Sequence, residues 1–104
     1  MRKSTIERNT NETKIYSKLN LDGSGKAKIL TGIGFFDHML EILSHHSLID
    51  LDIKVSGDTH VDFHHTVEDT AYVIAQGIIK SLGNKKGINR FGFFYVPMDE
   101  CLSR

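Results

Sequence analysis

Residues 64–83 read HHTVEDTAYVIAQGIIKSLG and carry the strongest secondary-structure signal in the chain. An apolar stripe recurs along this stretch at helical spacing, from Val67 to Leu82, which predicts an amphipathic helix that begins near His64. Gly83 followed by Asn84 is typical of a helix end. Because such a helix packs its apolar face on a second layer of structure, the residues before it are expected to supply that layer.

Two strand-like segments and a turn lie near the amino terminus. Residues 2–8 are expected to form a first strand, and residues 14–21 alternate apolar and polar side chains as a second. The sequence DGSG at 22–25 favours a tight turn, because glycine adopts the positive φ that hairpins need. Residues 26–31 are therefore predicted to return as the partner strand of a hairpin with residues 14–21.

The remaining elements alternate between helix and strand. Apolar spacing predicts a helix over 35–46 and a half-buried strand over 48–56, and residues 91–96 are expected to begin another strand. The order is strand, hairpin, helix, strand, helix, strand, with no linker or internal repeat. This order predicts an α+β fold in which one sheet carries both helices on the same face.

Length and composition exclude several classes of protein. The chain has 104 residues, which suits one small domain, and its 13 basic residues balance 13 acidic ones, so no nucleic-acid partner is expected. No apolar run approaches the roughly 20 residues that span a bilayer, and no signal-peptide core follows Met1. The lone Cys101 forms no internal disulfide. We expect a cytoplasmic protein without a membrane partner.

The histidines are the unusual feature of the composition. All six lie in the middle of the chain, at His38, His45, His46, His60, His64 and His65. In a helix, His64 and Glu68 lie one turn apart on nearly the same face, whereas His65 points about 100° away. Adjacent histidines cannot easily hold one ion from a regular helix, but they can contribute to two ions on either side of it. Imidazole and carboxylate groups are suitable ligands for Mn²⁺, Fe²⁺ or Zn²⁺.

The helix predicted over 35–46 adds to this pattern. His38, Glu41 and His45 share one of its faces by their spacing, with His46 one step around. The alternative is that a helix start simply favours acidic and polar residues near its positive end, which would explain the acids around Glu68 without a metal.

The candidate ligands are too few for the ions they predict. The four candidates are His38, His64, His65 and Glu68. Mn²⁺ prefers about six oxygen or nitrogen ligands, and the geometry points to two ions. We therefore expect further protein ligands from another segment or another subunit.

Several motifs together resemble the imidazoleglycerol-phosphate dehydratase family. They are TGIGFFDHML at 31–40, GDTHVD at 57–62, HHTVED at 64–69, GINRFG at 87–92 and VPMDE at 96–100. The resemblance runs from about Arg8 to the end of the chain. It implies one half of a tandem repeat with a ribosomal S5 domain 2-like architecture, in which residues 1–104 are the first repeat and the second repeat is absent.

The resemblance also implies a reaction and a metal. The family removes water from imidazole-glycerol phosphate to give imidazole-acetol phosphate in histidine biosynthesis, through a metal-bound imidazolate. Two Mn²⁺ ions serve each complete active site, and Zn²⁺ or Fe²⁺ can replace them. The sites lie between subunits of a 24-subunit shell built from trimers.

The family's functional positions fall on particular residues of this sequence. His38, His64, His65 and Glu68 match metal ligands that also contact substrate. Glu12 and His46 match catalytic, substrate-contacting positions, with Glu12 expected to transfer the proton. Arg90 matches a substrate-binding arginine, whose paired donors suit a phosphate group. His45 matches no functional position, and His60 is expected to be structural.

Two other functions are compatible with the same residues. The first is a different metal-dependent lyase or hydrolase that uses the same ligands. The second is a catalytically incomplete metal-binding half-domain that needs a second half or a partner chain. An assay with imidazole-glycerol phosphate separates both alternatives from the dehydratase.

Overall fold

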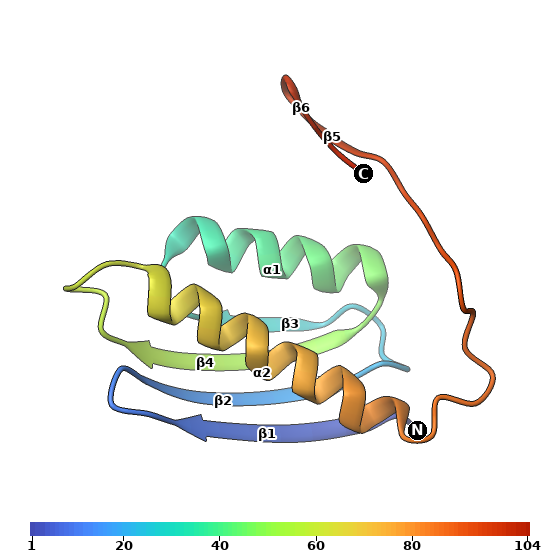
Figure 1. The fold of residues 1–104 in the computed structure, drawn as a ribbon, viewed down its shortest axis with the longest axis horizontal. Coiled ribbons are helices and arrows are strands. Elements are labelled where there is room, and N and C mark those ends of the chain that lie inside the picture. Colours follow the sequence, from blue (N-terminus) through green and yellow to red (C-terminus); the bar gives the residue numbers. More distant parts are fainter.

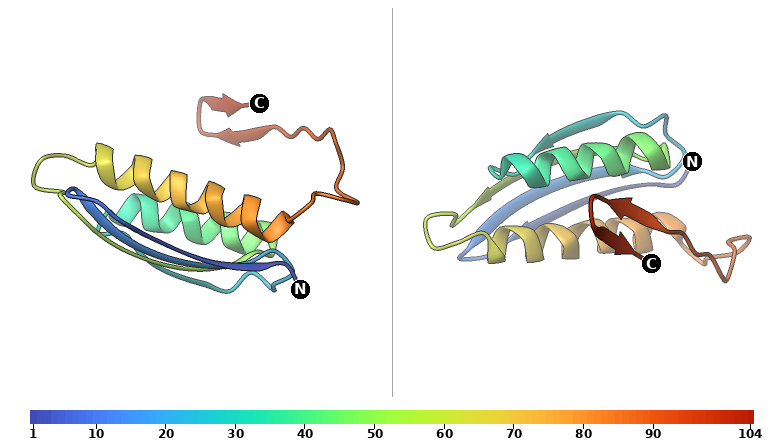
Figure 2. Two further views of the ribbon diagram at one scale, coloured as in Figure 1. Left: turned by 60° about the horizontal axis from the view of Figure 1, so that its bottom comes forward. Right: turned by 90° about the horizontal axis from the view of Figure 1, so that it is seen from above.

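A computed structural model describes residues 1–104. A four-stranded sheet is covered on one face by two helices, and a separate two-stranded hairpin follows (Figures 1 and 2). In chain order the elements are β1 (Lys3–Asn9), β2 (Thr13–Asn20), β3 (Ala27–Leu30), α1 (Gly34–Ser47), β4 (Asp50–Gly57), α2 (His64–Leu82), β5 (Val96–Met98) and β6 (Cys101–Ser103). The predicted α+β class, with both helices on one face of the sheet, is confirmed.

The four-stranded sheet has the order β1-β2-β4-β3. Strand β2 pairs antiparallel with both β1 and β4, and β3 pairs parallel with β4 after the α1 crossover. Alternate side chains of β2 and β4 point under the helices, where they form the core with two helical residues. The core consists of Ile15, Leu19, Leu40, Leu51, Ile53, Val55 and Val73.

The predicted hairpin between residues 14–21 and 26–31 is wrong. Strand β2 forms its hairpin with β1 instead, and β4 lies between β2 and β3. The Asp50 carboxylate accepts hydrogen bonds of 2.9 and 2.8 Å from the backbone N–H groups of Ser24 and Lys26, which holds the glycine turn beside the start of β4. Since β4 has a longer apolar face than β3, burying it next to β2 is the more stable pairing.

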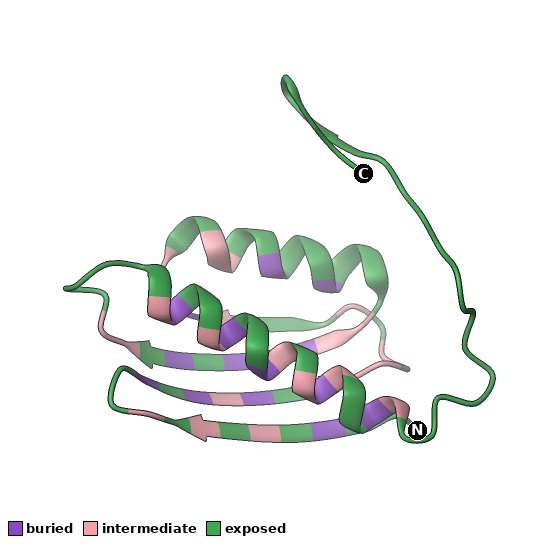
Figure 3. Ribbon diagram, viewed as in Figure 1, coloured by how far each residue is buried: buried purple, intermediate pink, exposed green.

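The strand predicted over 91–96 is also wrong. The chain leaves α2, runs as an unpaired segment to residue 95, and then forms the short β5–β6 hairpin (Figure 1). Every residue from Gly83 to the end is exposed, including Phe91, Phe93 and Phe94 (Figure 3). These residues have the composition of a strand but no neighbouring strand in this chain to pair with.

One end of the molecule gathers several loops and the starts of both helices. The β1–β2 turn, the C-terminal end of β4 and the first turns of both helices all lie at this end, on the left in Figure 1. None of the helices is both long enough and apolar enough to cross a membrane. The candidate site residues of α2 lie at this end of the molecule.

Candidate metal and substrate site

The first turn of α2 presents an imidazole and a carboxylate that touch each other. His64 Nε2 lies 3.0 Å from Glu68 Oε2, and the two side chains are 69% and 67% exposed. The i, i+4 spacing on the helix produces this contact, as the sequence predicts. Both groups therefore face solvent, where an ion or a substrate has access to them.

His65 turns away from His64 and contacts a different partner. The two rings lie 5.8 Å apart and nearly perpendicular. His65 Nδ1 lies 2.8 Å from Oδ2 of Asp58, in the loop between β4 and α2. The hydrogen bond with Asp58 is the largest cause that raises the pKa of His65, and the negative charges of Asp58, Glu12 and Asp62 raise this pKa further. The predicted divergence of the two adjacent imidazoles is confirmed.

Glu12 lies in the β1–β2 turn, next to the same loop. Its carbonyl oxygen accepts a hydrogen bond of 3.0 Å from the backbone N–H of Asp58. Glu12, Asp58 and His60 line one shallow depression, together with residues at the adjoining ends of β2 and β4. His60 is exposed in this depression and does not pack in the core.

The start of α2 is fixed to the sheet directly behind these residues. The buried Thr13 hydroxyl donates a hydrogen bond of 2.6 Å to Asp69 Oδ2. The guanidinium of Arg8 lies 3.8 Å from the other oxygen of that carboxylate. No side chain caps the helix at Phe63, and Asp62 Oδ1 instead accepts the N–H of His64 at 2.9 Å. These contacts set the direction in which the first turn of α2 points.

The other predicted site residues lie further away. His38 is exposed in the second turn of α1, and the first turns of α1 and α2 lie at the same end of the molecule (Figure 1). His46 lies in the last turn of α1, two turns further along and about 12 Å away by helix rise. Arg90 lies in the exposed segment after α2, where its guanidinium is 5.8 Å from the Phe91 ring. No three histidine, cysteine or acidic side chains come close enough to hold an ion.

Asp58 is the residue that sequence reasoning missed. In the sequence it is only one residue of the GDTHVD motif at 57–62, because no helical or strand spacing connects it with His65. The available signal was its position, an acid six residues before a histidine pair and just after a strand that ends beside the same helix. Only the path of the loop brings its carboxylate to the ring.

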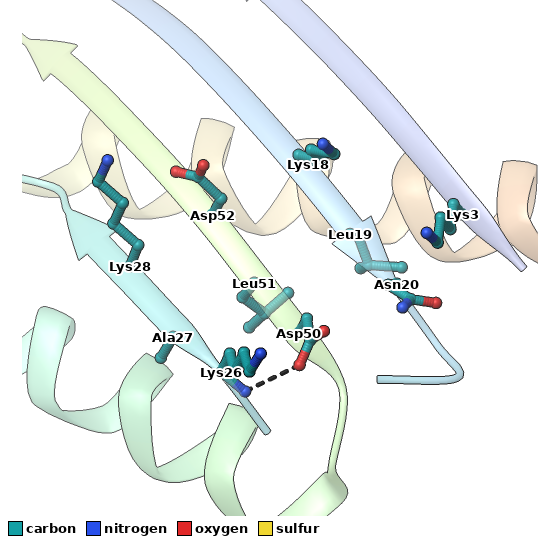
Figure 4. A pocket seen from close by; sticks show the side chains of 10 residues that line it. All are labelled: Lys3, Lys18, Leu19, Asn20, Lys26, Ala27, Lys28, Asp50, Leu51 and Asp52. Atoms are coloured by element: carbon teal, nitrogen blue, oxygen red, sulfur yellow. Dashed lines mark hydrogen bonds between the residues drawn. The ribbon is translucent and has the colours of Figure 1, made fainter. Parts of the chain in front are cut away.

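A second depression lies on the opposite face of the sheet (Figure 4). Its charged lining residues are Lys3, Lys18, Lys26, Lys28, Asp50 and Asp52. Asp52 lies between Lys18 and Lys28 in the row across the strands, and Asp50 binds loop backbone groups. This depression contains no histidine, and its four lysines outnumber its two aspartates, so it offers no ligand set for a cation and contributes nothing to the site on α2.

The fold and the exposed residues of α2 define a small α+β domain with a histidine–carboxylate cluster at one end. Comparison with known proteins gives its family. Residues 31–104 match the family model described as imidazoleglycerol-phosphate dehydratase. The chain belongs to the imidazoleglycerol-phosphate dehydratase family.

Individual relatives agree with this assignment. An imidazoleglycerol-phosphate dehydratase from Clostridium acetobutylicum is 63% identical over 97% of this chain and 51% of its own length. One from a Polaromonas species is 57% identical over 99% of this chain and 50% of its own length. The crystal structure of the Staphylococcus aureus dehydratase superposes with a TM-score of 0.77 at 33% identity, covering 96% of this chain and 53% of that one. The chain thus spans about half the length of the relatives it matches.

Proposed function

We propose that this chain supplies one half of a metal-dependent dehydratase site that converts imidazole-glycerol phosphate to imidazole-acetol phosphate and water in histidine biosynthesis. The observation that carries the proposal is the pair of diverging imidazoles on α2, with His64 beside Glu68 and His65 beside Asp58. The relatives' names support the reaction. A cytoplasmic location belongs to the same proposal and is supported by the free Cys101.

The donor atoms fit a divalent metal ion. A carboxylate such as Asp58 accepts hydrogen bonds only, so a neutral His65 that contacts it through Nδ1 keeps its Nε2 lone pair for a ligand. His64 and Glu68 add a nitrogen and a carboxylate oxygen, the donor types that Mn²⁺, Fe²⁺ and Zn²⁺ accept. We assign His38, His64, His65 and Glu68 to Mn²⁺ binding, two ions per complete site. When bound, the metal supplies positive charge that makes the substrate's imidazole easier to deprotonate.

The remaining residues would bind substrate and move protons. Glu12 is exposed beside the Asp58 loop, and its carboxylate can accept the proton that leaves carbon and pass it to the departing hydroxide, which leaves as water. Loss of that proton gives an enol, which becomes the ketone by tautomerisation. His46 lies in the last turn of α1 and Arg90 lies beyond the carboxyl end of α2, so neither is near the first turn of α2. We propose that they contribute to a site shared with another subunit.

The exposed apolar surface supports assembly. Phe35 and Leu43 on α1, and Phe91, Phe93 and Phe94 beyond α2, are between 48% and 86% exposed. Large exposed apolar side chains in this number are typical of surfaces that another protein surface covers. We propose that the remaining half of a family chain and further subunits cover them in a 24-subunit assembly.

A second function is favoured by two observations. The chain spans about half the length of its relatives, and no three donor side chains meet within it. A half-domain that binds metal weakly and turns over no substrate by itself would have these properties. Metal binding without turnover by the isolated chain is the result that this second function predicts.

Metal binding is the experiment that tests the proposed site. Mn²⁺ affinity of the chain is measured by titration calorimetry for the wild type and for His64→Ala, His65→Ala and His45→Ala. His45 is an exposed histidine at the far end of α1, so its variant is the control for loss of an imidazole outside the site. We expect at least a tenfold loss of affinity for the first two variants and none for the third. Equal affinity in all four proteins would contradict the site.

A further inference from the structure

We infer that Asp58 is the positioning residue of His65, which fixes the tautomer and direction of this ring so that Nε2 is the atom presented to a ligand. The inference rests on the proposed function for the identity of that ligand, a divalent metal ion. It concerns a contact in the protein itself, so it can be tested without metal and without substrate.

The contact has the chemistry that such a role requires. His65 Nδ1 and Asp58 Oδ2 are 2.8 Å apart, and the Asp58 side chain is 14% exposed. Because the carboxylate only accepts, Nδ1 carries the hydrogen, and the neutral ring is then unprotonated at Nε2. The second carboxylate oxygen is buried with no hydrogen-bond partner, so the hydrogen bond with His65 is the one the side chain makes. Its loss would leave the carboxylate poorly satisfied.

Asp58 is held firmly enough to direct a ring. Its backbone N–H donates to the Glu12 carbonyl at 3.0 Å, and its own carbonyl accepts the N–H of Val61 at 2.9 Å. These bonds continue the sheet by one step and close the turn after β4. The carboxylate is therefore attached to the sheet, whereas His65 belongs to α2, and the contact joins the two layers at the site.

The two adjacent histidines differ in this respect. His64 contacts a carboxylate through Nε2, with Glu68 on its own helix, and its Nδ1 makes no hydrogen bond. His65 contacts its carboxylate through Nδ1, which leaves Nε2 without a protein partner, and its side chain is 41% exposed. Only His65 thus has its ligand atom chosen by a residue outside the helix.

Asp62 provides a matched comparison within the same loop. It is an exposed acid whose carboxylate accepts the backbone N–H of His64 at 2.9 Å and makes no hydrogen bond with either ring. Replacing it by asparagine changes the charge of the loop as Asp58→Asn does, but it leaves the ring contact intact. The pair of variants separates a specific role of Asp58 from a general effect of negative charge.

The test is nitrogen NMR of the metal-free chain at a pH where the His65 ring is neutral, for the wild type, Asp58→Asn and Asp62→Asn. Wild-type His65 should be mainly the Nδ1–H tautomer. In Asp58→Asn the amide can donate to Nδ1, so the Nε2–H tautomer should increase, as when the carboxylate behind a catalytic histidine becomes an amide. Asp62→Asn should resemble the wild type, and amide spectra verify that each variant is folded.

Metal affinity is the second readout of the same variants. Mn²⁺ should bind Asp58→Asn about 10- to 100-fold more weakly than wild type, and Asp62→Asn within a few-fold of it. A wild-type His65 that is mainly Nε2–H, or an unchanged tautomer in Asp58→Asn, would overturn the inference. So would equal tautomer shifts in the two variants. If the chain binds no Mn²⁺ at all, the proposed function fails while the tautomer result still decides the role of Asp58.

Discussion

Thr13 on β2 donates a hydrogen bond of 2.6 Å to Asp69 on α2, and this buried contact lies one residue from Glu68. It connects a sheet residue that is 1% exposed with the helix turn that carries the candidate ligands. The first turn of α2 therefore takes its position from the sheet as well as from its own backbone. Contacts of this kind determine how well a site is ordered before a ligand binds.

The Thr13 contact predicts opposite effects for two similar substitutions. Thr13→Val keeps the shape but leaves the Asp69 carboxylate without its nearest donor, so we expect a loss of about 1–3 kcal/mol in the free energy of unfolding. Thr70 on α2 is also fully buried, but its hydroxyl has no hydrogen-bond partner. Thr70→Val should leave stability unchanged or raise it by up to about 1 kcal/mol. Urea unfolding measures both, and equal losses would contradict the assignment.

Replacing Gly57 with a larger residue should cause a steric clash next to the site. A Cβ atom at this position would collide with the side-chain oxygen of Thr66, which is fully buried beside His65. We expect Gly57→Ala to lower the free energy of unfolding by about 1–3 kcal/mol. Gly34→Ala is the control, because nothing lies within 4 Å of its added Cβ and alanine favours the helix that begins there. Thermal unfolding that ranks Gly57→Ala as stable as Gly34→Ala would show that the packing is looser than described.

The ion pair between Arg2 and Asp22 predicts a pH dependence of stability. Hydrogen bonds from Arg2 lower the pKa of Asp22 from 3.8 to about 2. Because the folded pKa is the lower one, the stabilisation is present above pH 3.8 and is lost as the pH falls toward about 2. Asp22→Asn should therefore unfold at lower urea than wild type at neutral pH, with a smaller difference near pH 2. The prediction would be contradicted if the difference in stability between the two proteins stayed the same in acid or at high salt.

A substitution at Glu12 tests the proposed proton transfer independently of metal binding. In an active assembly that contains this chain, Glu12→Gln should leave Mn²⁺ content unchanged and lower kcat by on the order of 100-fold or more, since the amide cannot accept a proton. Glu7→Gln on the exposed face of β1 is the control for loss of a nearby carboxylate. Turnover is measured as product formed after a fixed time, and the Mn²⁺ content is measured by metal analysis of the same samples. Near-normal turnover of Glu12→Gln would remove this residue from the mechanism.

Spacing along the chain predicted the helices well. The sequence predicts a second helix from near His64 to Leu82, and α2 begins and ends at these two residues. The prediction succeeds because the apolar stripe and the terminal glycine are local signals. The His64–Glu68 contact follows from the same helix geometry. Strand pairing is harder to predict from the sequence, because the glycine-rich turn at 22–25 suggests a hairpin regardless of which strands pair in the sheet. The partner of β2 is decided by which long strand buries more apolar surface, and β4 comes later in the chain.

Contacts between elements distant in the sequence were not accessible from spacing. The Asp58–His65 contact depends on the path of the loop after β4, and the Thr13–Asp69 contact joins residues 56 positions apart. The roles of His46 and Arg90 were expected only from the family resemblance. Within this chain they lie away from α2, so their roles stay predictions that concern a larger assembly.

A chimeric enzyme supplies the measurement that bears on the whole proposal. The aligned half of the Clostridium acetobutylicum relative is replaced by this chain, and dehydration of imidazole-glycerol phosphate is assayed with and without Mn²⁺. We predict Mn²⁺-dependent turnover that is abolished by His65→Ala and retained by His45→Ala. A folded chimera that gives no turnover with Mn²⁺, or one whose turnover survives His65→Ala, would contradict the proposal that this chain supplies half of the dehydratase site.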